Sequence, residues 1–255
     1  MKKILISGGG GRLAKQIIKH NVEYEVAAPT KKEMDITTRS SVETCISKYA
    51  PDIFLHAAAY TRPMKKHQDN PGLSVETNII GTANVVLACI EQNIKLVYIS
   101  TDYVYPGTRG DYKEEDPVSP YGTTSDGIAK YGWSKLGGEC AVRLYDNSLI
   151  LRVCTCNRPF PHAQAIGDVK KSYIFEDEAA LIILRLLDER GIINVGGRAQ
   201  TVYDFARNRV PNIKKIFAGD IGDVSMAPDT SMNTDKLTAI LERLDIEREA
   251  HAKKY

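Results

Sequence analysis

Short apolar runs alternate with stretches of helical periodicity along most of this chain. The runs are rich in Val, Ile and Leu and show little alternation, which is typical of strands buried on both faces of a parallel sheet. They cover residues 3–7, 24–28, 52–59, 95–100, 148–152 and 192–195. Helical periodicity follows at 12–19, 40–49, 70–92, 131–144, 176–187 and 201–209, and a last helix begins at Asn233 or Thr234. This alternation predicts an α/β fold with a doubly wound, mostly parallel sheet of the Rossmann type.

Composition narrows the class of protein. The chain has 255 residues, 43% of them hydrophobic and 26% charged, with a formal net charge of +2. These values fit an ordinary globular domain and give no reason to expect nucleic acid or a membrane surface as a partner. Met1 leads straight into a strand pattern without a signal-peptide region, and no apolar run approaches the roughly 18 residues that span a bilayer. Five irregularly spaced cysteines indicate reduced thiols, so we expect a cytoplasmic protein without a metal site.

A glycine-rich turn joins the first strand to the first helix. Read as Gly8-x-x-Gly11-x-x-Ala14, its spacing permits a tight turn, close backbone approach and close helix packing. Backbone amides at a helix N-terminus suit a pyrophosphate, whereas the alternative interpretation is a merely flexible turn. The cofactor contacts predicted here are Gly8, Gly10, Gly11, Arg12 and Leu13. Residues 1–152 are therefore interpreted as an NAD(P)-binding core, and 153–255 as a mixed segment that completes the sheet and forms a small substrate lobe.

The end of the second strand bears on cofactor choice. An NAD site usually has an acidic residue there, but this strand is followed by Lys31 and Lys32, which favours NADPH and leaves NADH possible. Solvated lysines are the alternative. Asp35 and Ile36 lie just beyond and are candidates to flank the adenine, or they simply precede the next helix.

Small and polar residues follow the third strand. Ala57, Ala58 and Ala59 allow a cofactor to lie against the backbone. Arg62 is a candidate for a substrate phosphate or a solvated arginine. Asn78 is expected to be buried in the middle of its helix, where it needs partners, and bridging to a catalytic lysine by water is one possibility.

Tyr131 and Lys135 carry the candidate chemistry. Their spacing places both on one face of a helix. An ammonium near a phenol favours the phenolate, so Lys135 is expected to lower the pKa of Tyr131 and to help it pass a proton to a carbonyl oxygen. Ser100 and Thr101, at the carboxyl end of the fourth strand, supply a hydroxyl for the same oxygen.

Together these motifs resemble the extended short-chain dehydrogenase/reductases, and more closely the dTDP-4-dehydrorhamnose reductase group. The matching stretches are residues 7–14, 34–37, 51–61, 78–84, 99–105, 131–139 and 149–152, with weaker matches at 191–195 and 230–237. The resemblance implies that Thr101 binds the substrate oxygen, Tyr131 donates the proton, and Lys135 binds the nicotinamide ribose. Tyr103 stands where related 4,6-dehydratases have a glutamate, and Asp102 where related 3,5-epimerising reductases have a cysteine, so neither of those reactions is implied.

Two departures from the family pattern affect the substrate half. Residues 121–130 are an insertion, and the segment between Arg152 and Ser172 is shortened where the family grips the nucleotide. Arg62, Asp102, Tyr103 and His162 are the candidate substrate contacts.

The expected function is an NADPH-preferring reductase of a nucleotide-linked 4-keto-6-deoxy sugar, and a homodimer is expected because helices often pair between subunits in this family. One alternative is another nucleotide-sugar epimerase or reductase. The other is a non-catalytic NADP-binding subunit, since a relative of this group regulates methionine adenosyltransferase.

Overall fold

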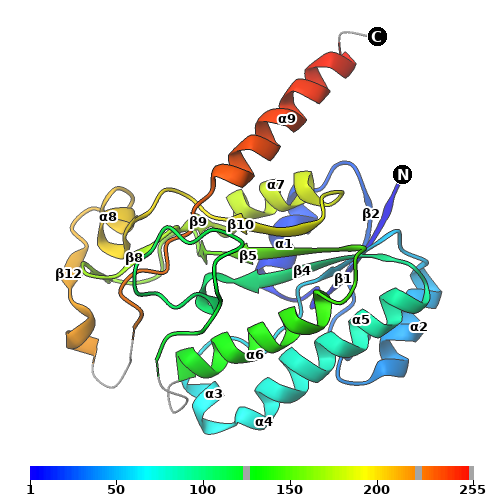
Figure 1. The fold of residues 1–255 in the computed structure, drawn as a ribbon, viewed down its shortest axis with the longest axis horizontal. Helices are drawn as coiled ribbons and strands as arrows, with labels where there is room; N and C mark the ends of the chain where they lie inside the picture. Colours follow the sequence, from blue (N-terminus) through cyan, green and yellow to red (C-terminus); the bar gives the residue numbers. More distant parts are fainter. Residues whose placement is uncertain (123–126, 222–225, 253–255) are drawn as a thin grey trace.

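A six-stranded parallel sheet forms the centre of the molecule (Figure 1). The structure is a computed structural model that describes residues 1–122, 127–221 and 226–252. In spatial order the strands are β2 (Glu25–Ala27), β1 (Lys3–Ser7), β3 (Ile53–His56), β4 (Lys95–Thr101), β5 (Ser148–Val153) and β10 (Gly191–Val195). The chain moves outward from β1 in one direction and then in the other, so the predicted doubly wound sheet is confirmed. The order reverses beside β1, where open sheets of this kind bind ligands.

Helices cover both faces of this sheet (Figure 1). On one face lie α1 (Arg12–His20) and α7 (Glu176–Leu186), and on the other α2 (Arg39–Tyr49), α5 (Gly81–Glu91) and α6 (Gly127–Val142). Ile4 and Ile6 of β1 pack in the first core cluster, whereas Leu5 between them packs in the second. Because both faces are buried, the strands are mostly apolar, and polar residues such as His56 and Arg152 lie near their carboxyl ends.

The expected helix over 70–92 is a composite. α3 (Lys65–Asp69) precedes α4 (Pro71–Ser74), a π-helical stretch η1 (Val75–Ile80) and α5. The Asn70 side chain caps α4 by accepting from Leu73 N at 3.4 Å.

Pro71–Glu91 is long and apolar enough to cross a membrane by length and composition, so the expectation that no stretch would reach this length is wrong. Core helices of soluble proteins pass the same test, and 44% of its most apolar window is buried within the protein.

The chain after β5 supplies β10 and three small sheets. β6 (Thr155–Cys156) pairs with β9 (Ile174–Phe175), β7 (Gln164–Ile166) with β12 (Lys214–Ile216), and β8 (Lys170–Lys171) with β11 (Gln200–Thr201). The remaining elements are α8 (Val202–Arg207), η3 (Ala218–Ile221) and α9 (Asp235–Ala252). Phe160, Phe175 and Phe205 centre a separate apolar cluster here.

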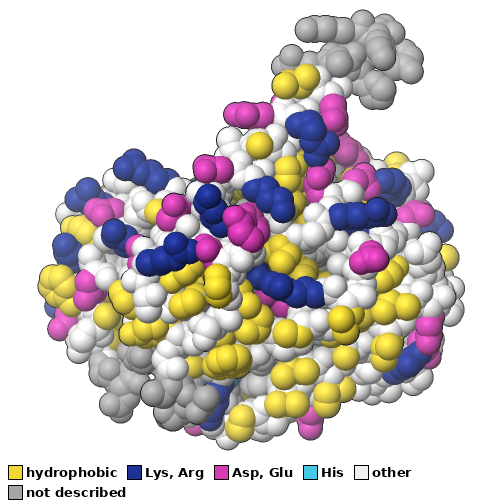
Figure 2. All heavy atoms as spheres, in the orientation of Figure 1, with side chains coloured by type: hydrophobic (Ala, Val, Ile, Leu, Met, Phe, Trp, Pro, Cys, Tyr) yellow, Lys and Arg dark blue, Asp and Glu magenta, His cyan; other side chains and the backbone are white. Residues whose placement is uncertain are grey.

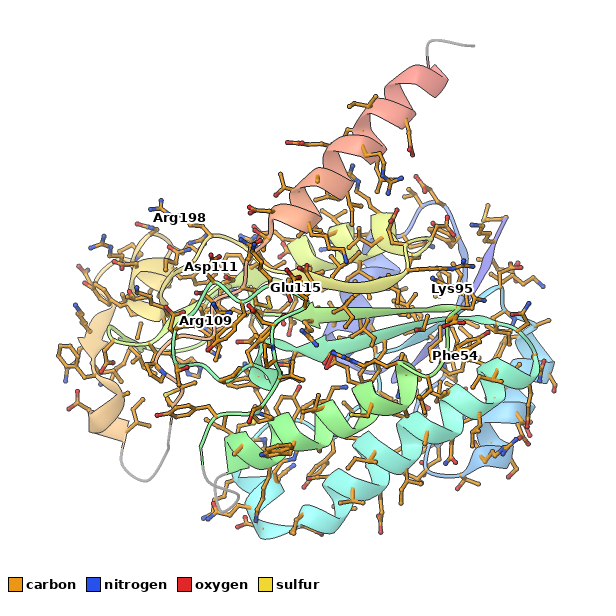
Figure 3. The ribbon with its side chains drawn as sticks, in the orientation of Figure 1. Phe54, Lys95, Arg109, Asp111, Glu115 and Arg198 are labelled. Carbon is orange, nitrogen blue, oxygen red and sulfur yellow. The ribbon has the colours of Figure 1, made fainter. Side chains whose placement is uncertain are left out.

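The loop between β4 and α6 contacts the C-terminal part of the chain. Tyr112 forms a β-bridge with Met232, and Asp111 N donates to Ser231 Oγ at 3.1 Å. Figure 3 marks Arg109, Asp111 and Glu115 along this loop. Of the predicted insertion at 121–130, residues 123–126 lie outside the described residues.

Candidate active site

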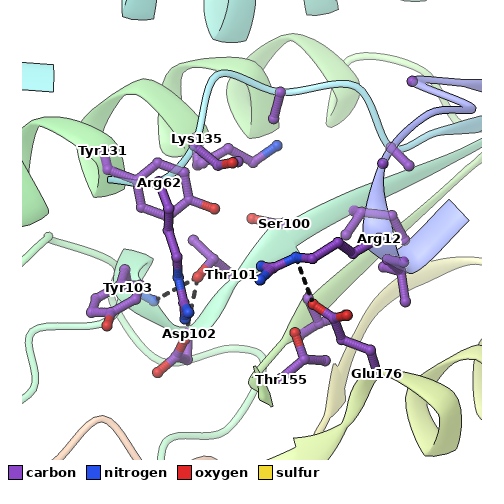
Figure 4. Close-up of a pocket in the computed structure, with 18 of the residues that line it drawn as sticks. Arg12, Arg62, Ser100, Thr101, Asp102, Tyr103, Tyr131, Lys135, Thr155 and Glu176 are labelled. Carbon is purple, nitrogen blue, oxygen red and sulfur yellow. Dashed lines mark hydrogen bonds and ion pairs between the residues drawn. The ribbon is translucent and has the colours of Figure 1, made fainter. Parts of the chain in front are cut away.

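The end of β4 and the first turns of α6 meet at the carboxyl edge of the sheet (Figure 4). Thr101 is the last residue of β4, and the 3₁₀ turn η2 (Asp102–Val104) leads the chain away. Gly132 allows α6 to pack against this turn, because a Cβ there would lie 2.6 Å from Tyr103 O. Tyr131 and Lys135 are thereby placed beside Thr101.

These residues share one cavity with the glycine turn. The cavity has a volume of about 220 Å³. Its walls include ten of the predicted cofactor-binding and catalytic residues: Gly8, Gly11, Arg12, Leu13, Ala57, Ala59, Ser100, Thr101, Tyr131 and Lys135. Ser100 Oγ is buried and has no hydrogen-bond partner among the described residues. The structure therefore brings the predicted cofactor turn and the predicted catalytic set to a single place.

The glycine turn is tight against two neighbouring strands. Gly8 has a φ of +72°, and a Cβ there would lie 2.8 Å from Ala58 Cα. A Cβ on Gly9 would lie 2.0 Å from Ala28 O, so Gly9 has even less room, although the motif reading did not single it out. Gly10 has open space around its Cβ position and is not among the cavity walls. Gly8 and Gly9 are thus the positions where only glycine fits.

Tyr131 is flanked by aromatic rings. The ring centroids of His67 and Tyr103 lie 5.2 Å and 6.0 Å from its own. Burial raises the pKa of Tyr131, the charges of Asp102 and Tyr103 add to this, and a hydrogen bond with Thr101 and the charge of Arg62 oppose it. The expected lowering of this pKa by Lys135 is wrong: burial raises it, and the groups that oppose the rise are Thr101 and Arg62.

Lys135 is buried and lies over an aromatic ring. Its Nζ is 4.0 Å from the ring centroid of Tyr98. Burial lowers the pKa of Lys135 to about 7, and the charge of Glu139 opposes the shift. An amine with this pKa can exchange a proton near neutral pH.

A buried histidine supports the turn from behind. Ser7 Oγ lies 2.7 Å from His56 Nδ1, and His56 Nε2 lies 3.0 Å from Thr82 Oγ1, which donates to Asn78 O at 2.8 Å. Burial lowers the pKa of His56 to about 3, and the charge of Lys135 adds to the shift. His56 is therefore neutral and joins the glycine turn to η1, a link that an apolar strand pattern could not reveal.

Several predicted cofactor contacts lie outside the cavity walls. Asp35 accepts from Thr37 N at 3.0 Å and lies 4.0 Å from Lys31 Nζ. Ile36 is buried in the second core cluster, and Ala58 N donates to Ser7 Oγ behind the turn. These side chains are occupied within the protein, so their predicted contacts with an adenine or phosphate stay predictions.

Asn78 is buried as expected, but its partners are different. Its side-chain oxygen accepts from Tyr60 N at 2.7 Å, and its amide donates to Tyr60 O and to Ser134 Oγ. Asn78 thus fastens the loop after β3 to α6 and does not line the cavity.

A second, larger cavity adjoins the first. It has a volume of about 1010 Å³, and Arg62, Met64, Tyr103, Lys171 and Tyr173 line both cavities. Of the predicted substrate contacts, Arg62 and Tyr103 line both and His162 lines the second. Asp102 lines the first, where it pairs with Lys171.

Sequence reasoning missed the residues that reach the cavity from the C-terminal part. Glu176 begins α7 and lies 3.3 Å from Arg12 Nε, while Lys171 lies on β8. Sequence reasoning also missed His67 of α3, which is buried against the ring of Tyr131 and has Nε2 3.0 Å from Thr61 O. The only local signals were an acidic helix start and two adjacent lysines in a short segment, and both patterns are common on surfaces.

Comparison with known proteins gives a consistent family. The profile of the RmlD substrate binding domain matches residues 1–156. Similar to this chain is the dTDP-4-dehydrorhamnose reductase of Aggregatibacter actinomycetemcomitans, 34% identical over 157 residues that cover 60% of this chain and 51% of that protein. Subunit beta of methionine adenosyltransferase 2 from Bos taurus is 29% identical over 150 residues, which cover 55% and 42%.

The fold agrees over nearly the whole chain. A crystal structure of dTDP-4-dehydrorhamnose reductase from Bacillus anthracis in complex with NADP has a TM-score of 0.82 at 25% identity, covering 97% of this chain and 100% of that one. In sequence, by contrast, the matched part spans about half the length of the relatives, or less. The resemblance drawn from the motifs is confirmed, and the chain belongs to the RmlD substrate binding domain family.

Proposed function

We propose that the chain is an NADPH-preferring reductase of a nucleotide-linked 4-keto-6-deoxy sugar. The observation that carries this is the convergence of the glycine turn, Thr101, Tyr131 and Lys135 on one cavity. A keto group is reduced to an alcohol by one hydride at carbon and one proton at oxygen. The nicotinamide supplies the hydride when the cofactor is bound.

The residues present fit a dinucleotide. Gly8 and Gly9 leave no room for a Cβ, so the turn packs closely against its neighbours, and Gly8, Gly11 and the unpartnered Ser100 Oγ line the same cavity. Gly11, Arg12 and Leu13 would hold the pyrophosphate at the start of α1. Lys31 supports a preference for a 2′-phosphate, in line with the relative crystallised with NADP, while NADH remains the second cofactor to test.

The chain's own groups handle the substrate oxygen. Thr101 and Tyr131 hold it between two hydroxyls, and Tyr131 donates its proton there as the alkoxide forms. Lys135, with a pKa of about 7, supplies positive charge or a proton within the same cavity.

The test follows NADPH oxidation by absorbance with a panel of nucleotide-linked 4-keto-6-deoxy sugars. Tyr131→Phe should lower kcat by about 100-fold or more while NADPH binding is kept. Tyr121→Phe, which removes a phenol that lines neither cavity, is the matched control and should keep full activity. Full turnover by Tyr131→Phe would contradict the proposal.

A second candidate is a non-catalytic NADP-binding subunit. It is favoured by the similarity to methionine adenosyltransferase 2 subunit beta. Tight NADPH binding without oxidation on any sugar, together with a stable complex with another protein, would support it. An epimerase would instead invert a sugar centre without net consumption of NADPH.

We also propose a cytoplasmic homodimer that pairs through the helices opposite α1 and α7. Exposed apolar side chains gather over α4, η1, α5 and α6 (Figure 2). Val75, Ile80, Leu87 and Trp133 are each 44–48% exposed. Leu87→Glu with Trp133→Glu should give a monomer in sedimentation, whereas Ile246→Glu on α9 should leave the dimer intact. Wild-type protein that is monomeric, or that binds lipid vesicles, would contradict this pairing.

A further inference from the structure

Lys171 lies where the two cavities meet. It is on β8, outside the 156 residues that match the family profile, and only 3% of its side chain is exposed. Its Nζ is 2.7 Å from Asp102 Oδ2 and 3.8 Å from the ring centroid of Tyr103. Asp102 directly follows Thr101, so Lys171 acts on the turn that presents the candidate catalytic hydroxyl.

Asp102 has more than one donor. Lys171 Nζ and Thr230 Oγ1 each donate to Oδ2 at 2.7 Å, and Thr101 Oγ1 donates to Oδ1 at 3.2 Å. The bond from Thr101 is the longest of the three. Because two strong donors remain on Oδ2, Thr101 can turn its hydroxyl hydrogen toward a substrate oxygen without leaving the carboxylate unsatisfied.

The charge of Asp102 also reaches Tyr131. A buried carboxylate without a partner costs several kcal/mol, and its negative charge makes a neighbouring phenol a weaker acid. Asp102 already contributes to raising the pKa of Tyr131. Burial lowers the pKa of Lys171, but the charges of Asp102 and Tyr103 outweigh it, so Lys171 stays an ammonium and offsets the carboxylate.

We propose that Lys171, together with Thr230, is a positioning residue that neutralises Asp102, so that Thr101 can donate its hydroxyl to the substrate carbonyl and Tyr131 can give up its proton. This rests on the reductase function proposed above. The segment after residue 156 thus completes the electrostatics of a site whose catalytic residues all precede it.

The experiment compares four variants with wild type under the conditions of the sugar panel. Lys171→Met removes the charge at similar length, and Lys171→Arg keeps it. Lys170→Met is the matched control, because its side chain is 58% exposed on the same strand. The double variant Asp102→Asn/Lys171→Met removes both charges. Activity, KM, NADPH affinity from fluorescence, and melting temperature are measured from mildly acidic to mildly alkaline pH.

Lys171→Met should lower kcat by about 100-fold, a loss typical of disturbing one oxygen-binding group, with NADPH affinity nearly unchanged. Lys171→Arg should stay within about 10-fold of wild type, since charge is kept and geometry is not. Lys170→Met should match wild type. The double variant should recover at least part of the activity that Lys171→Met loses.

The pH profile separates positioning from simple destabilisation. The other titratable groups around the pair are Tyr103, Tyr131, Cys154 and Tyr173. In Lys171→Met the activity should rise as pH falls, because protonation of Asp102 removes the uncompensated charge, and this slope should vanish in the double variant. An unchanged kcat, or a loss with the wild-type pH profile and no recovery in the double variant, would overturn the proposal.

The outcome is distinguishable from failure of the reductase. A wild type that oxidises no NADPH would overturn the proposed function and with it the role in proton donation. The neutralisation of Asp102 is then decided by the melting curves, where Lys171→Met should lose melting temperature with rising pH and the double variant should not. Parallel curves for all variants would overturn the neutralisation itself.

Discussion

The part of the chain up to residue 156 and the part after it use polar side chains differently. In the first part, the buried Ser7, His56 and Thr82 behind the glycine turn form a neutral link between regular elements. The second part instead sends charged side chains into the site of the first, namely Lys171 and Glu176. Local motifs can therefore place reacting groups, while distant segments set the charge around them.

Breaking a buried ion pair of the first part, which is connected to the second part through Tyr105 and Asn194, should have the largest effect. Arg152 is fully buried, with Nε 2.9 Å from Glu139 Oε1 and Nη1 2.7 Å from Tyr105 Oη, which in turn donates to Asn194 on β10. Arg152→Met should lower the free energy of unfolding by about 3–5 kcal/mol, because it leaves Glu139 buried and unpaired.

Urea denaturation measures this loss. The control is Arg185→Met, whose pair with Asp245 is exposed and should contribute less than about 1 kcal/mol. Equal losses in the two variants would show that the buried pair contributes no more to stability than an exposed pair.

Acid should weaken the neutral network of the first part. The pKa of His56 is about 3 in the folded protein, against 6.5 for a free histidine. Below pH 6.5, His56 is therefore protonated in the unfolded chain but stays neutral in the folded protein. The free energy of unfolding falls as pH falls toward 3. The slope should be about 1.4 kcal/mol per pH unit, measured by urea denaturation between about pH 6.5 and 4.5.

His56→Gln removes this titration and should flatten the slope. A variant that keeps the full wild-type slope would assign the acid sensitivity to other groups.

Replacing Arg62 should have a smaller effect, on substrate binding. It lines both cavities, so it can hold an anionic group of the substrate that lies in the second cavity. Arg62→Met should raise KM for the sugar substrate about 10-fold, close to 1.4 kcal/mol, with NADPH affinity unchanged. Lys65→Met on α3, outside both cavities, is the matched control. A loss of NADPH affinity in Arg62→Met would place this arginine with the cofactor.

Expectations from the sequence were most successful where one local pattern carries both structure and chemistry. The glycine turn, Thr101, Tyr131 and Lys135 could all be located because strand, turn and helix signals surround them. The pKa of Tyr131 could not be foreseen, since it depends on burial by His67 and Tyr103 and on the charge of Asp102. Ile36 and Asn78 were located correctly in the chain, but only packing shows that their side chains face the protein.

By itself, the sequence determined the doubly wound sheet and the residues at its carboxyl edge. Hydrophobic periodicity and glycine spacing are local properties, and parallel strands bring their ends together wherever they pair. Only the tertiary structure decided that Lys171 and Thr230 meet Asp102, across 69 and 128 residues of chain. The physical reason is that a buried charge needs an opposite charge at hydrogen-bonding distance, and no local pattern records which distant residue provides it.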